Sequence, residues 1–172
     1  LKSYDEKTAI LVVESHSQAD PDSLLKLKQT LAKQFLPPGM DDKIDLAQFR
    51  LWYSQAGTPK ITARLSHEGD VATLTLRQEV PPTPGQEHKQ PMVIPLKLAL
   101  FDPASGRHQG ERLVVLDRAE MEFAFPGFAA RPVLSLNRGF SAPVAIDADT
   151  TRDDLVFLAA NDDDPFARYE AL

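Results

Sequence analysis

This 172-residue chain has four histidines and 25 acidic residues whose side chains could bind a metal ion. The histidines, His16, His67, His88 and His108, lie far apart in segments that we expect to be turns or loops. No H-E-x-x-H or H-x-H sequence brings two imidazoles to one metal ion. The acidic run 162–164 lacks the alternating acids, the glycine and the final glutamate of a calcium loop, so we interpret it as a solvated turn. We therefore predict neither a metal site nor a cofactor in this chain.

Motifs for nucleophilic catalysis and phosphate binding are also missing. The tripeptide Ser15-His16-Ser17 is no catalytic pair, because neighbouring residues of an extended segment point to opposite faces. Cysteine is absent, no G-x-S-x-G sequence occurs, and the 8 glycines form no phosphate-binding loop. We predict no catalytic residue, but 25 acidic residues leave a small enzyme with a carboxylate pair as an open alternative.

Composition limits the classes of partner and location. A formal net charge of -6 and a pI near 5.2, without a cluster of Lys and Arg, argue against nucleic-acid binding. The longest apolar runs, such as 9–13 and 113–116, are far shorter than the roughly 20 residues of a membrane-spanning helix, so we expect no membrane partner. The lack of cysteine fits a reducing compartment, and no signal peptide is readable after Leu1. We expect a cytoplasmic location.

Residues 1–43 form an N-terminal segment of unclear origin with one predicted strand and one predicted helix. The strand is the β-branched run 9–13, and the helix runs from Asp20-Pro21 to about Phe35. A junction helix is then predicted in residues 44–57, where Leu46, Phe49 and Tyr53 share a face and Trp52 sits beside them.

The aromatic residues of the junction helix allow two interpretations of their role. Trp52 and Tyr53 could form a sugar-binding platform or could pack against protein, and we favour packing. Phe49, Trp52 and Tyr53 are therefore our candidates for contact with a neighbouring domain.

Residues 58–150 change to the period-two pattern of β-strands. Apolar residues alternate with polar ones in seven short runs between Lys60 and Asp147, and Gly69 predicts a hairpin turn. The runs are 61–65, 72–76, VIPLKLALF, ERLVVL, MEFAF, PVLSLN and APVAID. The proline-rich segment 81–91 is predicted to be an exposed loop, and Pro95 indicates an edge position or a bulge. Without helices between the runs, we expect antiparallel strands in two packed sheets.

Residues 151–172 return to helical spacing. Leu155, Leu158 and Ala159 recur at helical intervals, and Asp153 places a favourable negative charge near the helix start. DDDPFARYEAL is typical of a turn followed by the opening of another helix.

Three separated strings of the sequence resemble one family. FRLWYSQAGTP, from Phe49 to Pro59, looks like the junction segment of the bacterial alanyl aminopeptidase N group of M1 metallopeptidases. Residues 75–102 are similar to the proline-rich loop and following strand of that family, and the likeness continues in 140–171. The strings occur in the order and spacing of the family, so the resemblance spans roughly Ile44 to Leu172. Residues 1–40 do not resemble the end of the family's catalytic domain.

The resemblance implies a mostly β chain with an immunoglobulin-like antiparallel β-sandwich, the third domain of a larger enzyme. Such a domain follows a thermolysin-like catalytic domain and precedes a C-terminal helical domain, so its partners would be the flanking domains of the same polypeptide. The family's H-E-x-x-H zinc motif and G-A-M-E-N motif are absent here, and no catalytic residue is carried over. Zinc would belong to the parent's catalytic domain, and this chain would be a structural spacer. The alternative is an independent β-sandwich that binds carbohydrate or protein through the loop 81–91.

Overall fold

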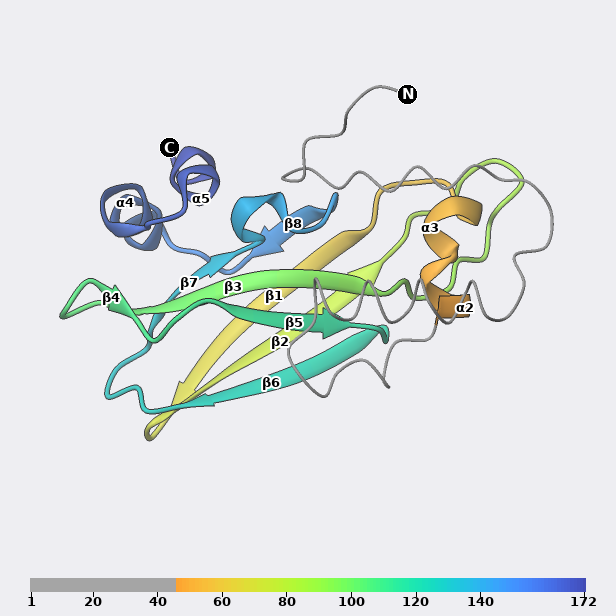
Figure 1. Cartoon of the computed structure of the whole chain (residues 1–172). Helices are drawn as coiled ribbons and strands as arrows, with labels where there is room; N and C mark the ends of the chain where they lie inside the picture. The colour runs from red at the N-terminus through yellow and green to blue at the C-terminus, as the bar shows by residue number, and fades with distance from the viewer. Residues whose placement is uncertain (1–45) are drawn as a thin grey trace, which may run out of the picture. The chain divides into compact units, whose positions relative to one another are not determined.

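The computed structural model describes residues 46–172 (Figure 1). The strand expected at 9–13 and the helix expected at 20–35 lie outside these residues. The elements, in chain order, are α2 (Leu46–Phe49), α3 (Leu51–Ser54), β1 (Lys60–Glu68), β2 (Val71–Glu79), β3 (Ile94–Asp102), β4 (Arg107–His108), β5 (Arg112–Leu116), β6 (Glu120–Pro126), β7 (Val133–Leu136), the 3-10 helix η1 (Arg138–Phe140), β8 (Ala145–Ala148), α4 (Arg152–Asn161) and α5 (Pro165–Glu170).

The strands form two sheets that face each other (Figure 1). One sheet has the order β6-β2-β1-β8, and in the other β3 pairs with β4, β5 and β7. The hairpin β1–β2 pairs from Lys60↔Glu79 to Glu68↔Val71, and Gly69 takes the positive φ of 62° that its tight turn requires. The predicted mostly β sandwich of two packed sheets is therefore confirmed, together with the C-terminal helix.

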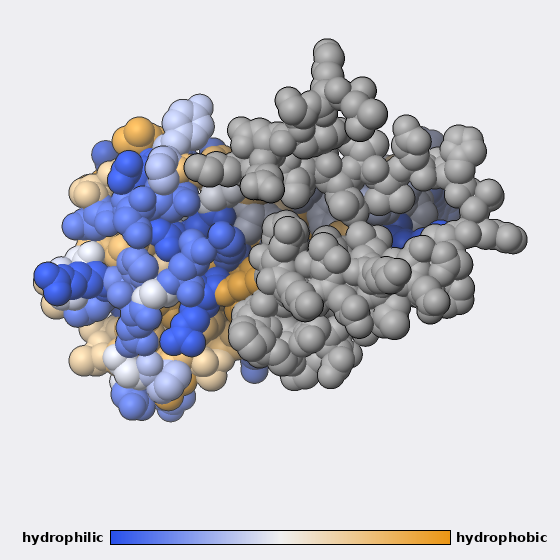
Figure 2. Space-filling model, in the orientation of Figure 1, coloured by the Kyte–Doolittle hydropathy of each residue, from blue (hydrophilic) through white to orange (hydrophobic). Residues whose placement is uncertain are grey.

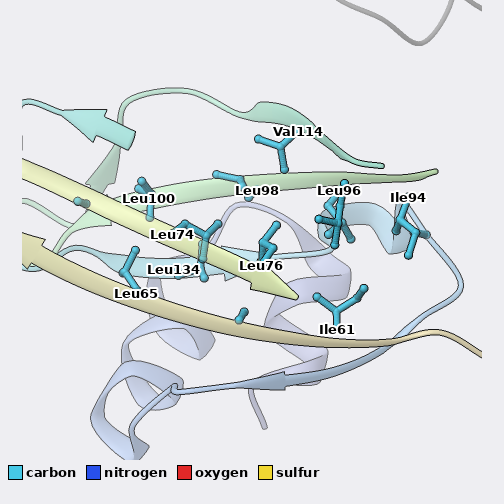
Figure 3. Close-up of a cluster of buried hydrophobic side chains, with 14 of the residues drawn as sticks. Ile61, Leu65, Leu74, Leu76, Ile94, Leu96, Leu98, Leu100, Val114 and Leu134 are labelled. Atoms are coloured by element: carbon cyan, nitrogen blue, oxygen red, sulfur yellow. The ribbon is translucent and has the colours of Figure 1, made fainter. Parts of the chain in front are cut away.

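The core lies between the two sheets and is built from the alternating residues of the strands (Figure 3). Ile61 and Leu74 from one sheet, and Leu96 and Leu98 from the other, are completely buried. Their polar neighbours in the sequence point to the opposite face, so the period-two pattern predicted the inward face correctly.

Two details of the pairing differ from the expectation of seven antiparallel strands. β4 is an additional two-residue strand that pairs with the end of β3 through Phe101↔His108. β8 pairs with β1 in parallel, from Lys60↔Ala145 to Ala63↔Ala148. Because the chain crosses from β7 to the other sheet through η1, β8 enters beside β1 in the same direction, and no hairpin constrains it to run antiparallel.

The end of β3 is buried on both faces. Leu98 and Leu100 face the sandwich core, whereas Ala99 and Phe101 pack with Val133 of β7 and Leu158 of α4 in a second cluster. The four consecutive apolar residues 98–101 are typical of a strand covered on both sides. α4 therefore packs on the outer face of the sheet.

Pro95 is tolerated because β3 is an edge at that position. β5 pairs with β3 from Ile94 to Leu98, but β7 reaches only from Leu98 to Phe101. The missing N–H of Pro95 consequently breaks no ladder. The predicted edge position is confirmed locally, although β3 is central further along.

Candidate functional site at the two junctions of the sandwich

The segments that enter and leave the sandwich contact opposite ends of β3. α2 and α3 lie near its first residue, whereas α4 and α5 lie near its last residues (Figure 1). We define the N-terminal junction as residues 48–56 with the loop 81–93. We define the C-terminal junction as Glu111, Arg138 and the segment 161–168.

Trp52 attaches the N-terminal junction to the sandwich. Its indole Nε1 donates a hydrogen bond to the Val93 carbonyl oxygen at 2.8 Å, and the ring packs with Leu51 against the core. Tyr53, in contrast, is 72% exposed, and Phe49 is half-buried. The side chains that pack inward from α3 are therefore Leu51 and Trp52, while Tyr53 points to solvent, because the sandwich lies on the other side of this helix.

Glutamine amides supply further directional bonds at this junction. The Gln48 Nε2 donates to the carbonyl oxygens of Pro91, at 3.0 Å, and of Asp117. Gln55 bonds the backbone of Gln90 twice, accepting at 2.6 Å and donating at 2.9 Å. Two hydrogen bonds from one side-chain amide to the N–H and C=O of a single residue fix orientation as well as distance.

Hydrogen bonds join the proline-rich loop to the end of α3. The Gln86 side chain accepts from Ala56 N at 2.8 Å and donates to the Ser54 carbonyl at 2.8 Å. The Lys89 ammonium donates to the Ala56 carbonyl, to Thr83 Oγ1 and to Gln86 Oε1 at 2.8, 2.8 and 2.6 Å. The segment is a loop, as predicted, with one isolated antiparallel bridge between Thr83 and Gln86. The side chains of Thr83, Gln86 and Lys89 are engaged within the chain, which disfavours the loop as a binding surface for a separate partner.

Gln78 closes the same end of the sandwich from inside. Its side chain is buried, and its Oε1 accepts from Met92 N at 2.7 Å. Its Nε2 lies 2.8, 3.2 and 2.9 Å from the carbonyl oxygens of Met92, Leu116 and Arg118, which share its two hydrogens. One amide thus joins β2, the end of the loop 81–93 and the end of β5, which gives that loop a fixed base.

At the other end, α4 begins with a capping box. Thr151 Oγ1 accepts from Asp154 N at 3.1 Å, and Asp154 Oδ2 accepts from Thr151 N at 3.0 Å. Arg131, in the connection before β7, donates to Asp154 Oδ2 at 3.1 Å. Burial raises the pKa of Asp154, but the bonds from Thr151 and Arg131 outweigh it, and the pKa lies below its ordinary value.

A buried ion pair holds the turn between α4 and α5. Arg138 is 2% exposed and Asp162 is buried completely, and Arg138 Nη2 lies 3.0 Å from Asp162 Oδ1. The same nitrogen contacts Asp163, and Arg138 Nη1 lies 3.4 Å from Glu111 Oε2. The expectation of a solvated turn at 162–164 is therefore wrong for Asp162, because a buried guanidinium compensates its charge.

The charges of this cluster act on one another. Burial lowers the pKa of Arg138, but Asp162 and Asp163 outweigh it and raise that pKa above its ordinary value. Burial raises the pKa of Asp163, but Arg138 and His108 outweigh it, and its pKa lies below the ordinary value. His108 Nε2 lies 3.3 Å from Asp163 Oδ1.

The loop that carries Arg138 has left-handed backbone angles. Asn137, Gly139 and Phe140 have φ values of 58°, 60° and 53°. The Asn137 side chain stabilises this shape, since its Oδ1 accepts from Ala142 N at 2.9 Å and from Ser141 Oγ at 3.0 Å. A non-glycine aromatic residue in this region is strained, and Phe140, 55% exposed, packs against Phe166 of α5 at 5.4 Å between ring centroids.

The histidines do not gather at either junction. His67 lies in β1 and His108 in β4 rather than in loops, and His88 lies in the loop 81–93. His67 Nε2 contacts the Phe128 carbonyl at 2.8 Å. In the described part, 46–172, no group of three or more His, Asp or Glu side chains is placed to hold a metal ion. His16 and the tripeptide 15–17 lie outside that part.

The described residues also bear on the alternative of an enzyme with a carboxylate pair and on the prediction about membranes. Asp162 is the one fully buried carboxylate from residue 46 onward, and its partner is Arg138, so this part of the chain contains no buried carboxylate pair. None of the helices between Leu46 and Leu172 is both long and apolar enough to cross a membrane. The surface visible in Figure 2 is mainly hydrophilic, with smaller hydrophobic areas.

Sequence reasoning missed most of the polar residues of both junctions. Arg138 was not singled out, because one arginine beside a glycine carries no signal of burial. The bonding glutamines, Gln48, Gln55, Gln78 and Gln86, show no periodic pattern, and their partners are backbone atoms distant in sequence.

Comparison with known proteins places this geometry in a family. Residues 57–149 match the family model described as a domain of unknown function, DUF3458, with an Ig-like fold. The chain is similar to three proteins named aminopeptidase N: it is 40% identical to that of Haemophilus influenzae over 140 residues, 35% to that of Escherichia coli over 137, and 42% to that of Caulobacter vibrioides over 129. These matches cover 76%, 74% and 74% of the chain.

A solved aminopeptidase structure is also similar to this chain. Legionella pneumophila aminopeptidase A in complex with aspartic acid matches 87% of the chain with a TM-score of 0.66 and 25% identity. The chain spans only a small part of each relative, 16%, 16% and 15% of the three aminopeptidases N and 16% of the Legionella protein.

Proposed function

Because this chain belongs to the DUF3458 family of immunoglobulin-like domains, we propose that it is the connecting domain of an M1 zinc aminopeptidase, placed between the catalytic domain and the C-terminal helical domain. The aminopeptidase relatives, which contain the matching segment as a small share of their length, support this proposal. In it, the parent hydrolyses peptides with zinc held outside this chain, and the flanking domains of the same polypeptide are the partners. The cytoplasmic location stays part of the proposal, supported by the lack of cysteine.

The observation that carries the proposal is that both ends of the sandwich hold their flanking helices by directional polar bonds. Trp52 and Gln55 fix α3 to the loop 81–93, and Arg138 fixes the turn after α4. Flexible linkers are rich in Gly and Ser and make few contacts. Bonds of this kind transmit a fixed angle from one end of the sandwich to the other, which is what a spacer must do.

The first test of the proposal is an activity assay. The purified chain, with and without added zinc, should not hydrolyse an alanyl reporter substrate, whereas the parent should. Zinc-dependent turnover by the chain after rigorous removal of contaminating peptidases would contradict the proposal.

The second test concerns contact with a flanking domain, for which Phe49, Trp52 and Tyr53 remain the candidates. Tyr53 is 72% exposed here, so hydroxyl-radical labelling should modify it strongly in the isolated chain. In the parent the labelling of Tyr53 should fall several-fold. Arg77 of β2 is also exposed, so a probe placed at that position serves as the reference for comparing the two proteins. Equal labelling of Tyr53 in both proteins would remove it from the interdomain contact.

A further inference from the structure

α5 is weakly held by apolar packing. Of its six residues, Pro165–Glu170, only Ala167 is buried, while Phe166 is half-buried and Tyr169 is 72% exposed. The ring of Phe166 meets that of Phe140, which is itself largely exposed. Apolar contacts of this extent do not determine one orientation for so short a helix.

Polar bonds instead converge on Asp162, just before α5. Its Oδ1 accepts from Arg138 Nη2 at 3.0 Å and from Asp164 N at 2.8 Å, and its carbonyl accepts from Arg168 Nη1 at 2.9 Å. Asp164 Oδ1 in turn accepts from Ala167 N at 2.8 Å and caps α5. The position of Asp162 therefore determines that of the first turn of α5.

We propose that Arg138 is the positioning residue that sets the direction in which α5 leaves the sandwich, acting through the buried carboxylate of Asp162. Arg138 belongs to η1 and also contacts Glu111 from the connection between β4 and β5, so its side chain is anchored to the sandwich itself. Without the guanidinium, a completely buried carboxylate would have no countercharge, and the turn 162–164 would move outward to hydrate it. The consequence for a following domain, but not the positioning itself, rests on the proposed spacer function.

The chain contains no cysteine, so two introduced cysteines can carry the only spin labels. Labels at Arg77→Cys in β2 and Tyr169→Cys in α5, both exposed positions, report the placement of α5 by dipolar electron paramagnetic resonance. A reference pair uses Arg77→Cys with Val156→Cys in α4, since Leu158 anchors that helix in the second cluster.

In the otherwise unchanged chain we expect one narrow distance distribution for each pair. Arg138→Met should broaden the α5 distribution at least twofold while the α4 distribution stays narrow. Arg138→Lys, which keeps the charge but can bond fewer acceptors, should broaden it less. The matched control Arg64→Met removes the exposed ion pair with Asp147 and the hydrogen bonds to the carbonyls of Ala63 and Asp147, all within β1 and β8, and should change neither distribution.

Coupling between the two residues gives an independent readout. Adding Asp162→Asn to Arg138→Met removes the uncompensated charge and should narrow the α5 distance distribution again. If Arg138 acted only through the packing of its side chain, the second substitution would not narrow the distribution. A narrow α5 distribution in Arg138→Met, or equal broadening of both pairs, would overturn the inference. Because no peptidase activity is measured, such a failure is distinct from failure of the proposed spacer function.

Discussion

The indole nitrogen of Trp52 lies 2.8 Å from the carbonyl oxygen of Val93, one residue before the central strand β3 begins. This bond joins the two short helices at the entrance of the sandwich to the strand whose far end packs under α4. Trp52 is the only tryptophan of the chain, so fluorescence reports directly on the N-terminal junction.

Trp52→Phe should lower the free energy of unfolding by about 1 to 2 kcal/mol, because the Val93 carbonyl loses its donor while the apolar packing is largely kept. The measurement is urea denaturation followed by far-ultraviolet circular dichroism. Tyr53→Phe is the matched control, since it removes a hydroxyl from an exposed ring and should stay within about 0.5 kcal/mol of the unchanged chain. Equal effects of the two substitutions would show that the Trp52 bond contributes nothing.

Gln78→Leu should destabilise the sandwich by about 3 kcal/mol, because one backbone N–H loses its acceptor and three carbonyls lose the two amide hydrogens that they share, all at a largely buried site. Gln109→Leu removes a single exposed bond to Gly127 and should cost less than about 0.5 kcal/mol. Thermal unfolding of both variants provides the comparison. A Gln78→Leu chain as stable as the Gln109→Leu chain would refute the role of Gln78 in closing this end.

Leu96→Ala should lower the free energy of unfolding by about 2 to 5 kcal/mol, since the residue is completely buried between the sheets and truncation leaves a cavity. Val156→Ala, at a position that is 63% exposed, should lower it by less than about 0.5 kcal/mol. Chemical denaturation monitored by circular dichroism distinguishes the two, and similar losses would contradict the placement of Leu96 in the core.

Acid should weaken the chain through Asp154, whose pKa is held below the ordinary value of 3.8. A carboxyl with a lower pKa in the folded than in the unfolded chain stabilises the fold above its unfolded pKa. That stability is lost as the pH falls through the folded pKa, so unfolding free energies should decline from about pH 5 downward.

Asp154→Asn tests this origin. The amide keeps an oxygen that can accept from the Thr151 N–H, but it does not titrate. The variant should be less stable than the unchanged chain at pH 7 and should lose less stability between pH 5 and pH 2. Urea denaturation at several pH values provides the measurement, and two parallel curves would assign the acid sensitivity to other groups.

The sequence by itself determined the β-sandwich. Alternation in residues 61–65 and 72–76 identifies the buried face, because successive residues of a strand point to opposite sides. Gly69 and the proline-rich segment mark the hairpin and the loop, because positive φ and missing N–H groups are local properties. Of the three family-like strings, 75–102 lies within the residues 57–149 that match the DUF3458 model, and the other two overlap its ends.

Only the tertiary structure decided which polar residues hold the two junctions. Arg138 and Asp162 are distant in sequence, and nothing local marks either as buried. The parallel placement of β8 and the outward direction of Tyr53 likewise depend on where other segments lie. Strand periodicity follows from backbone geometry and is written in each segment, whereas burial of a charge depends on which distant groups surround it.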